Sequence, residues 1–465
     1  MQITLIGAGF CGSTLAVELL RQGGPDTRVT LVGQPETFGR GVAYGAARPE
    51  HVLNVRAKDL GADAQAPTGF ADTLALGERG RMAFLPRLAY GEYLQSHLQQ
   101  ATESASGFAR IEEEAIGVDR VPGGFRVLLA NGEDFFSDVV VLTVGALPPQ
   151  RLAGVGPRLA VDPRYIGWPW QDGAIDRIPP GARLLIVGAG LTMADVAVTL
   201  RQRDHRGPIT ALSRHGFLPQ AHLEVPGAPL ELPPGVLQAL RDHDLRTLVR
   251  TLRQLSTVVD DWRRVVDALR PHLQPFWRGL DQAARARFLR HLRSHWEAMR
   301  HRVAPAVSKQ VQAMQASGQL RVLSGRLLRA RLGVHDVEAL IRPRGGESTW
   351  LGHFDVVIRA TGLDTDIERT SHPLVATLRD SGLLGADPLG LGVDADHHLQ
   401  LRDPFGTPVT GLYCLGPLLR GQLWEITAVP ELRTAARTLA ARLLSQQARA
   451  GRGHATDDAA LREAG

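Results

Sequence analysis

The sequence predicts an α/β fold in which one strand–turn–helix unit occurs twice. An apolar strand over residues 3–6 is followed by the glycine pattern of residues 7–12 and by an apolar, helix-compatible run. Residues 184–200 repeat this order of strand, glycine turn and helix. Each unit is followed later in the chain by a buried strand that ends in Thr and Gly, over residues 138–145 and 355–362. Four motifs in this order predict two Rossmann-like dinucleotide-binding domains.

The first glycine turn has the spacing that a pyrophosphate requires. Gly7 permits the tight turn, Gly9 lets the backbone approach the phosphates, and Gly12 lets the helix pack on the strand. The helix directs unpaired N–H groups and its positive dipole end to the same place. We therefore expect a dinucleotide here, contacted also by Phe10 and Cys11, and the alternative is an ordinary strand–helix turn.

Composition excludes several classes of protein. The 465 residues contain no apolar run of about 18 residues, so no membrane span is expected. A strand that begins at residue 2 leaves no room for a signal peptide, and we expect a cytoplasmic protein. The net charge of +5 comes almost entirely from scattered Arg, with no legible nucleic-acid module. Cys11 and Cys414 are the only cysteines, which argues against disulfide reductases and cysteine-based zinc sites.

The second strand, over residues 28–32, ends where the adenosine ribose of a dinucleotide would lie. An acidic residue about 20 positions after the last glycine usually binds this ribose. Gly33 occupies that position here, so the acid is missing. Gln34 or Glu36 is expected to take its place.

Two short motifs follow this strand. Residues 39–45 read GRGVAYG, and residues 51–55 read HVLNV. Glycines on both sides of Arg40 suit a loop that lays its guanidinium against a phosphate, with Tyr44 in the same loop. The alternative is a plain surface turn.

The second glycine turn differs from the first at its third position. Gly188 and Gly190 are present, but Met193 replaces the third glycine, so the helix is expected to lie slightly further from its strand. Leu191 and Thr192 begin the helix and would contact phosphate. Asp195 would cap or orient the turn.

The next strand, over residues 209–212, indicates which nicotinamide cofactor is used. It ends in Ser213 and Arg214, at the place where NAD sites carry an acid. This pair favours a 2′-phosphate, and hence NADPH over NADH. An incidental surface Arg is the alternative.

An Arg-rich helical pattern covers residues 236–317, with Trp262, Trp277 and Trp296 as apolar anchors. We interpret it as an inserted helical lid on the substrate side. His291 and His295 have helical spacing but no accompanying Glu, and no metal site is expected.

Four segments together resemble the bacterial FAD-NAD(P)-binding protein family: GRGVAYG, HVLNV, VGAGLTMAD and WEITAVPE, the last at residues 424–431. The resemblance covers roughly residues 1–444. It implies a fold like that of flavin-containing and N-hydroxylating monooxygenases, in which an NADP domain interrupts an FAD domain. The first turn would then bind FAD and the second NADPH. Further cofactor contacts are expected from Thr143, Gly145, Thr361, Gly362 and Gly416.

These flavoproteins often carry an FxGxxxHxxx(W/P) segment before the second glycine turn. Residues 165–170 read YIGWPW at that place and lack the His. This difference weakens the expectation of oxygenation more than that of NADPH binding.

The leading hypothesis is a single-component flavin monooxygenase that acts on a small molecule with O2 through a C4a-(hydro)peroxyflavin. Arg40 and Asn54 would face the flavin, and Asn54, Trp424 and Glu425 are the candidate catalytic residues. Helix packing and capping are the alternative roles of the last two. The alternative functions are an NAD(P)H-dependent flavin reductase or dehydrogenase without oxygen insertion, and a non-enzymatic redox sensor.

The expected organisation, as a monomer or a homodimer, has six parts. They are the FAD domain in two parts (1–150 and 366–445), the NADP domain in two parts (151–234 and 318–365), the helical insertion (235–317) and a flexible tail (446–465).

Overall fold

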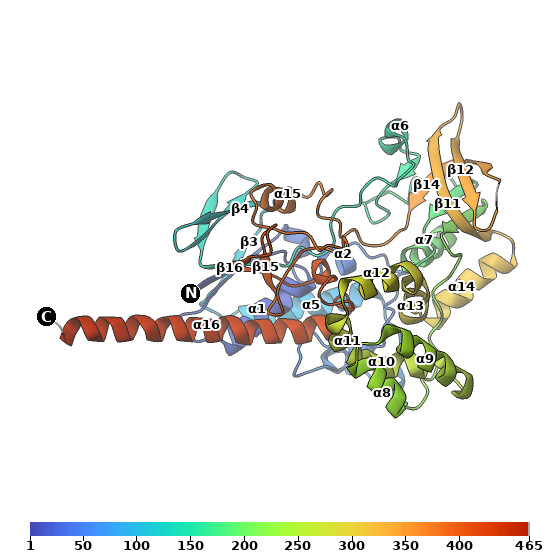
Figure 1. Ribbon diagram of the computed structural model, residues 1–465. Helices are drawn as coiled ribbons and strands as arrows, with labels where there is room; N and C mark the ends of the chain where they lie inside the picture. The colour runs from blue at the N-terminus through green and yellow to red at the C-terminus, as the bar shows by residue number, and fades with distance from the viewer. Residues whose placement is uncertain (347, 464–465) are drawn as a thin grey trace.

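The computed structural model describes residues 1–346 and 348–463 and contains two mostly parallel sheets, each with its own core (Figure 1). The first sheet has the order β15-β16-β7-β1-β2-β3. All its neighbours run parallel except the edge strand β15. Its strands are β1 (Gln2–Ile6), β2 (Arg28–Val32), β3 (Phe108–Ile111), β7 (Val139–Leu142), β15 (Gln400–Arg402) and β16 (Pro408–Cys414).

Helices from three distant parts of the chain pack together on the first sheet. Helix α1 (Phe10–Gln22) contacts both α5 (Arg87–Thr102) and α16 (Val429–Glu463). Its inner face, which includes Leu15 and Leu19, is completely buried. Shorter helices are α2 (Gly41–Gly45), α3 (Gly69–Thr73), α4 (Glu78–Arg81), α6 (Pro157–Ala160) and α15 (Pro373–Asp380).

A small antiparallel sheet is attached to the first domain. It consists of β4 (Ala115–Val121), β5 (Gly124–Leu129) and β6 (Asp134–Ser137), with α15 against β4. The predicted Asn131-Gly132 turn connects β5 and β6, and Gly132 adopts a φ of 88°. A positive φ at this position is what such a turn requires.

The second sheet has the order β13-β12-β11-β10-β9-β14-β8. Strands β8 to β11 and β14 form its parallel part, whereas β11, β12 and β13 form an antiparallel meander. The strands are β8 (Tyr165–Ile166), β9 (Leu184–Val187), β10 (Ile209–Ser213), β11 (Leu320–Leu332), β12 (Val337–Pro343), β13 (Trp350–Phe354) and β14 (Val356–Arg359). Helices α7 (Leu191–Gln202) and α14 (Pro305–Ala316) share its core.

Six helices between β10 and α14 form the helical insertion. They are α8 (Pro234–Arg241), α9 (Leu245–Val258), α10 (Trp262–Leu269), α11 (Leu273–Gly279), α12 (Gln282–His291) and α13 (Arg293–Arg300). Asp244, Asp261 and Asp281 cap α9, α10 and α12 with their carboxylates, which explains where these helices begin. The apolar core of the insertion also contains Leu391 and Trp424 from the first domain.

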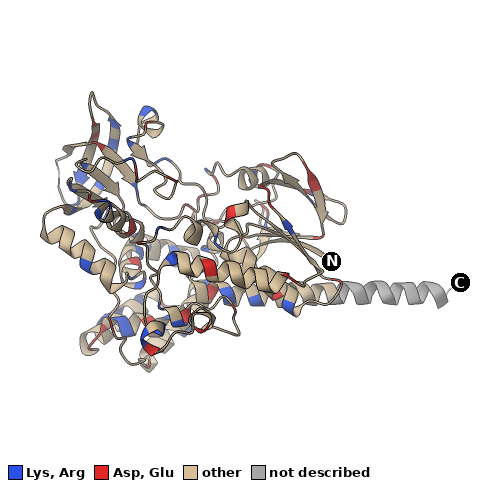
Figure 2. Cartoon of the chain, turned by 180° about the vertical axis from the view of Figure 1, so that it is seen from behind, with Lys and Arg blue, Asp and Glu red and all other residues tan. Residues whose placement is uncertain are grey.

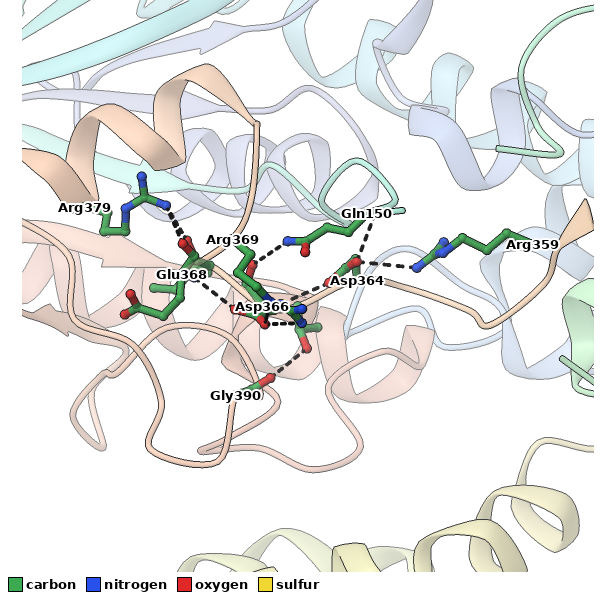
Figure 3. A network of polar contacts seen from close by, with 10 residues as sticks. Gln150, Arg359, Asp364, Asp366, Glu368, Arg369, Arg379 and Gly390 are labelled. Carbon is green, nitrogen blue, oxygen red and sulfur yellow. Dashed lines mark hydrogen bonds and ion pairs between the residues drawn. The ribbon is translucent and has the colours of Figure 1, made fainter. Parts of the chain in front are cut away.

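Two linkers connect the domains and lie side by side (Figure 3). An isolated antiparallel bridge pairs Leu147 with Asp364. The Asp364 Oδ2 accepts a hydrogen bond from the Gln150 N–H at 3.1 Å and lies 3.4 Å from the Arg359 Nη2. The second domain is therefore inserted into the first, and the linkers that lead into and out of it are paired.

Helix α16 packs on α1, and its backbone continues as a helix to Glu463. The sequence predicts a flexible tail over 446–465, but residues 446–463 belong to this helix, and residues 464 and 465 lie outside the described part of the chain. Among the helices of the described residues, none is long and apolar enough to cross a membrane.

Candidate functional site

One cavity of about 1260 Å³ extends between the two domains and the helical insertion. The first glycine turn, the loop around Arg40, the beginning of α7 and the last turn of α13 all line it. Of the residues predicted from the sequence, its lining contains Gly7, Gly9, Phe10, Cys11, Gln34, Arg40, Tyr44, Asn54, Thr143, Gly145, Leu191, Thr192 and Asp195.

The first glycine turn is closed tightly by strand β7. Gly7 has a φ of 114°, and a Cβ at this position would lie 2.4 Å from the Thr143 carbonyl oxygen. A Cβ on Gly12 would lie 2.0 Å from the Gly7 carbonyl oxygen. The Thr143 hydroxyl donates to the Gly7 carbonyl at 2.7 Å. The roles predicted for Gly7 and Gly12 thus follow from contacts that exclude any side chain.

The loop around Arg40 packs directly on this turn. Gly41 has a φ of 55°, and a Cβ on Gly9 would lie 3.2 Å from its Cα. The Arg40 Nε is buried and has no hydrogen-bond partner among the described residues. A buried guanidinium nitrogen requires an acceptor. A glycine cradle with an unpartnered cation beside it fits the phosphates of a dinucleotide.

Cys11 has the environment of a packing residue. It is 7% exposed, and burial raises the pKa of its thiol to about 12. A Cβ on Gly416, whose φ is 133°, would lie 3.3 Å from the Cys11 Sγ. Gly416 therefore contacts the end of the turn from behind, and the Cys11 thiol stays protonated.

The missing acid after β2 has a steric cause. A Cβ on Gly33 would lie 2.6 Å from the Ala8 Cβ, so no carboxylate fits there. Gln34 lines the cavity, whereas Glu36 is exposed and does not. The Gln34 Nε2 lies 3.4 Å from the Glu114 Oε2, and Glu114 also lines the cavity.

Sequence analysis missed Glu114 because it follows β3, on the far side of β2 from the first turn. The separation of 80 residues in the chain hides a neighbour that the sheet order β1-β2-β3 creates. A polar residue just after the next strand of the sheet was the only available signal.

The second glycine turn is more open than the first. A Cβ on Gly188 would lie 2.0 Å from the Ala360 carbonyl oxygen, which matches the arrangement at Gly7. Gly190, by contrast, is exposed, and a Cβ added to it would meet no atom within 4 Å. Met193 is completely buried and fills the place of the third glycine.

Like Gly188 and Gly190, four further residues predicted for the second site lie outside the cavity lining. Ser213 is the last residue of β10, and its Oγ accepts a hydrogen bond from the Gly216 N–H at 3.0 Å. The other three, which are Arg214, Thr361 and Gly362, are exposed. These three residues therefore lie on the solvent-exposed surface of the second domain.

Asp195 joins the two domains. Its carboxylate lies 2.8 Å from the Arg87 Nη2 at the start of α5. The His51 Nε2 lies 2.9 Å from the Thr199 Oγ1, one turn further along α7. Burial raises the pKa of Asp195, and Arg87 opposes this shift. The expected capping role of Asp195 is replaced by an interdomain ion pair.

Trp424 and Glu425 pack against the helical insertion. The Trp424 ring lies 4.8 Å from the Trp277 ring, centroid to centroid. The Trp296 Nε1 donates to the Glu425 Oε1 at 2.8 Å. Both residues are buried and neither lines the cavity, so their placement does not support the expected contact with a flavin.

Asn54 lies at the cavity wall, in contact with His222. Its main-chain oxygen is 3.0 Å from the His222 Nε2. Trp168 and Trp170, from the segment that lacks the fingerprint His, also line the cavity. Of the three candidate catalytic residues Asn54, Trp424 and Glu425, Asn54 is thus the one that lines the cavity.

Comparison with known proteins gives the same architecture. Residues 4–147 match the family model described as FAD-NAD(P)-binding. No curated protein matches the chain.

Solved structures share the fold over nearly the whole chain. The ornithine N-hydroxylase of Kutzneria sp. 744 has a TM-score of 0.63 at 15% identity, covering 96% of this chain and 99% of that one. The L-lysine 6-monooxygenase of Pseudomonas syringae has a TM-score of 0.62 at 18% identity, covering 97% and 99%. The thioredoxin reductase of T. acidophilum has a TM-score of 0.52 at 12% identity, covering 96% and 98%.

At such low identities these likenesses establish the fold. The predicted arrangement of two Rossmann-like domains with a helical insertion is confirmed. Residues 4–147 of this chain are similar to the FAD-NAD(P)-binding family over the first domain.

Proposed function

We propose that the protein is an NADPH-dependent, FAD-containing monooxygenase that oxygenates a small molecule with O2. The observation that carries this proposal is the cavity of about 1260 Å³, which connects the first glycine turn and Arg40 with the start of α7 and with the helical insertion. Two dinucleotides and a substrate could meet in such a space. The shared fold with an ornithine N-hydroxylase solved with reduced FAD, NADP+ and L-ornithine supports it.

The first site would hold FAD, which supplies the redox chemistry when bound. Gly7 and Gly9 would admit the pyrophosphate, and Arg40 would donate its unpartnered Nε to a phosphate oxygen. Gln34 and Glu114 would bind the adenosine ribose in place of the missing acid.

The second site would hold NADPH at the start of α7, with Thr192 toward its phosphates. Arg214 would bind the 2′-phosphate on the exposed side of β10. After burial, the nearby Arg344 and Arg214 lower the pKa of His215, which indicates a positive potential there. We expect Arg214→Ala to raise the KM for NADPH about tenfold, the loss of one charged hydrogen bond, and to leave the KM for NADH unchanged. Equal effects on both would contradict the 2′-phosphate assignment.

The oxygenation itself is tested with labelled dioxygen. The purified holoprotein should carry FAD, oxidise NADPH, and transfer one labelled oxygen atom to a substrate that mass spectrometry detects. Flavin reduction by NADPH with all the oxygen recovered as hydrogen peroxide, for every substrate that stimulates NADPH oxidation, would contradict it.

One observation favours a second candidate, a flavin reductase or dehydrogenase without oxygen insertion. The segment 165–170, two of whose Trp residues line the cavity, lacks the His of the monooxygenase fingerprint. In that case an electron acceptor other than O2 should reoxidise the flavin faster than O2 does.

A further inference from the structure

Both domains have a third parallel strand beside the strand that follows the glycine turn. In the first sheet, β3 lies beside β2, and Glu114 follows β3 at the cavity. In the second sheet, β11 lies beside β10, with Ser324 paired to Ser213. The side chains near Ser324 therefore have the topological position in the second domain that Glu114 has in the first.

Arginines occupy this position in the second domain. The parallel pairing of β11 with β10 ends at Ser324, and Arg326 follows two residues later. The Arg344 N–H, just after β12, donates to the Ser324 carbonyl oxygen at 2.9 Å. The Ser324 Oγ donates to the Arg214 carbonyl oxygen at 3.5 Å. Arg214 and Arg344 are thus both joined to Ser324 through their main-chain atoms.

The guanidinium of Arg344 is directed toward the residue that follows Arg214. Its Nη1 donates to the His215 Nδ1. Because a guanidinium cannot accept a hydrogen bond, this contact places the ring proton on Nε2 and requires a neutral His215. Burial, and then the charges of Arg344 and Arg214, lower the pKa of His215, in agreement with this contact.

The charges of these arginines are not neutralised within the described part of the chain. Arg214, Arg326 and Arg344 are exposed, and none forms an ion pair with a described carboxylate. Arg326 also lies directly opposite Arg342 in the ladder of β11 and β12. Like charges opposite each other destabilise a sheet. Basic segments gather on this part of the second sheet (Figure 2), and an anion bound among them would relieve the repulsion.

We infer that Arg344, together with Arg214, binds the 2′-phosphate of NADPH and sets the preference for NADPH over NADH. In the first domain a carboxylate, Glu114, would accept hydrogen bonds from ribose hydroxyls. At the same topological position in the second domain, guanidinium groups would donate to a phosphate, for which their donor geometry is suited. This inference rests on the proposed function, because it concerns the cofactor of the same second site.

The site is tested on the full chain with FAD bound, by calorimetry and without turnover. The probes are 2′,5′-ADP, which carries the 2′-phosphate, and 5′-AMP, which lacks it. The parent protein should bind 2′,5′-ADP at least tenfold more tightly than 5′-AMP. Arg344→Gln should weaken the binding of 2′,5′-ADP about tenfold, since a charged donor is lost, and leave the binding of 5′-AMP unchanged.

Arg331→Gln is the matched control. Arg331 lies on the same sheet, roughly 20 Å along β11 from Ser324, and its Nη2 pairs with the Glu338 Oε2 at 2.7 Å. This variant should bind both probes as the parent protein does. Arg344→Lys, which keeps the charge but loses the planar set of donors, should recover only part of the affinity. Arg344→Gln combined with Arg214→Ala should bind 2′,5′-ADP no better than 5′-AMP.

Unchanged binding of 2′,5′-ADP by Arg344→Gln would overturn the inference. An equal loss for both probes would also overturn it, because the variant would then have displaced the loop rather than removed a phosphate ligand. So would an equal loss in Arg331→Gln, which would make the net charge of the sheet the cause. Failure to transfer labelled oxygen would contradict the proposed function alone, since both probes bind without turnover.

Discussion

The two glycine turns begin alike and end differently. Gly7 and Gly188 are both held at positive φ against a carbonyl of the returning strand, so neither tolerates a side chain. At the second glycine, Gly9 meets the Gly41 loop, whereas Gly190 faces open space. A closed turn suits a cofactor that stays bound, and an open turn suits one that exchanges at each turnover. The loop packed on the second glycine of each turn therefore distinguishes the two turns.

The largest losses of stability are expected at the first glycine of each turn, where the two turns have the same structure. Gly7→Ala and Gly188→Ala would each place a methyl group within 2.4 Å of a carbonyl oxygen at an unfavourable φ. Each should lower the free energy of unfolding by about 3 kcal/mol or more. Chemical denaturation measures this, and Gly7→Ala should also lose its flavin during purification. Ordinary stability in either variant would contradict the tight closure of that turn.

The contact between the domains should make the stability depend on pH through His51. Burial and then Arg87 lower the pKa of His51 from 6.5 to about 4. Between these values the unfolded chain binds a proton that the folded chain does not, so stability falls as the pH drops from 6.5 to 4. The full loss is on the order of 3 kcal/mol. Unfolding measured across this range should show a shallower slope in His51→Gln, and an unchanged slope would contradict the assignment.

The ion pair between Arg87 and Asp195 should contribute less than these. Arg87→Ala leaves Asp195, which is mostly buried, without its partner. The expected loss is about 2 kcal/mol, with looser NADPH binding if α7 carries the proposed second site. A double variant, Arg87→Met with Asp195→Leu, should recover most of the stability. If it remained as unstable as Arg87→Ala, the charge of Asp195 would not be the cause.

The smallest effects on stability are expected at the second glycine of each turn, where the two turns differ. Gly190→Ala meets no atom and should change the free energy of unfolding by less than about 0.5 kcal/mol. Gly9→Ala, which must displace the Gly41 loop, should weaken FAD binding about tenfold, as measured by flavin fluorescence. Equal flavin affinity in the two variants would remove the distinction between a closed and an open turn.

The sequence predicted the parts of the fold that local pattern controls. The glycine spacing, the buried strands and the repeated order of motifs are visible without the structure. What it missed depends on contacts between distant segments. Glu114 approaches Gln34 only because β3 lies beside β2.

The same reason explains why the sequence left two roles open for Trp424 and Glu425. Trp424 and Glu425 stand out as rare residues in a helical run, which is typical of both cofactor contacts and domain interfaces. Only the packing of Trp277 and Trp296 shows that the interface applies here.

The pairing of the two linkers makes it possible to separate the first domain from the second. Since Leu147 and Asp364 are bridged, the residues between them begin and end at nearly the same point. Joining these two positions by a short turn would produce the first domain as an independent polypeptide. This shortened chain would expose the Trp424 side chain, which the insertion covers in the full protein. A polar residue should therefore replace Trp424 in it.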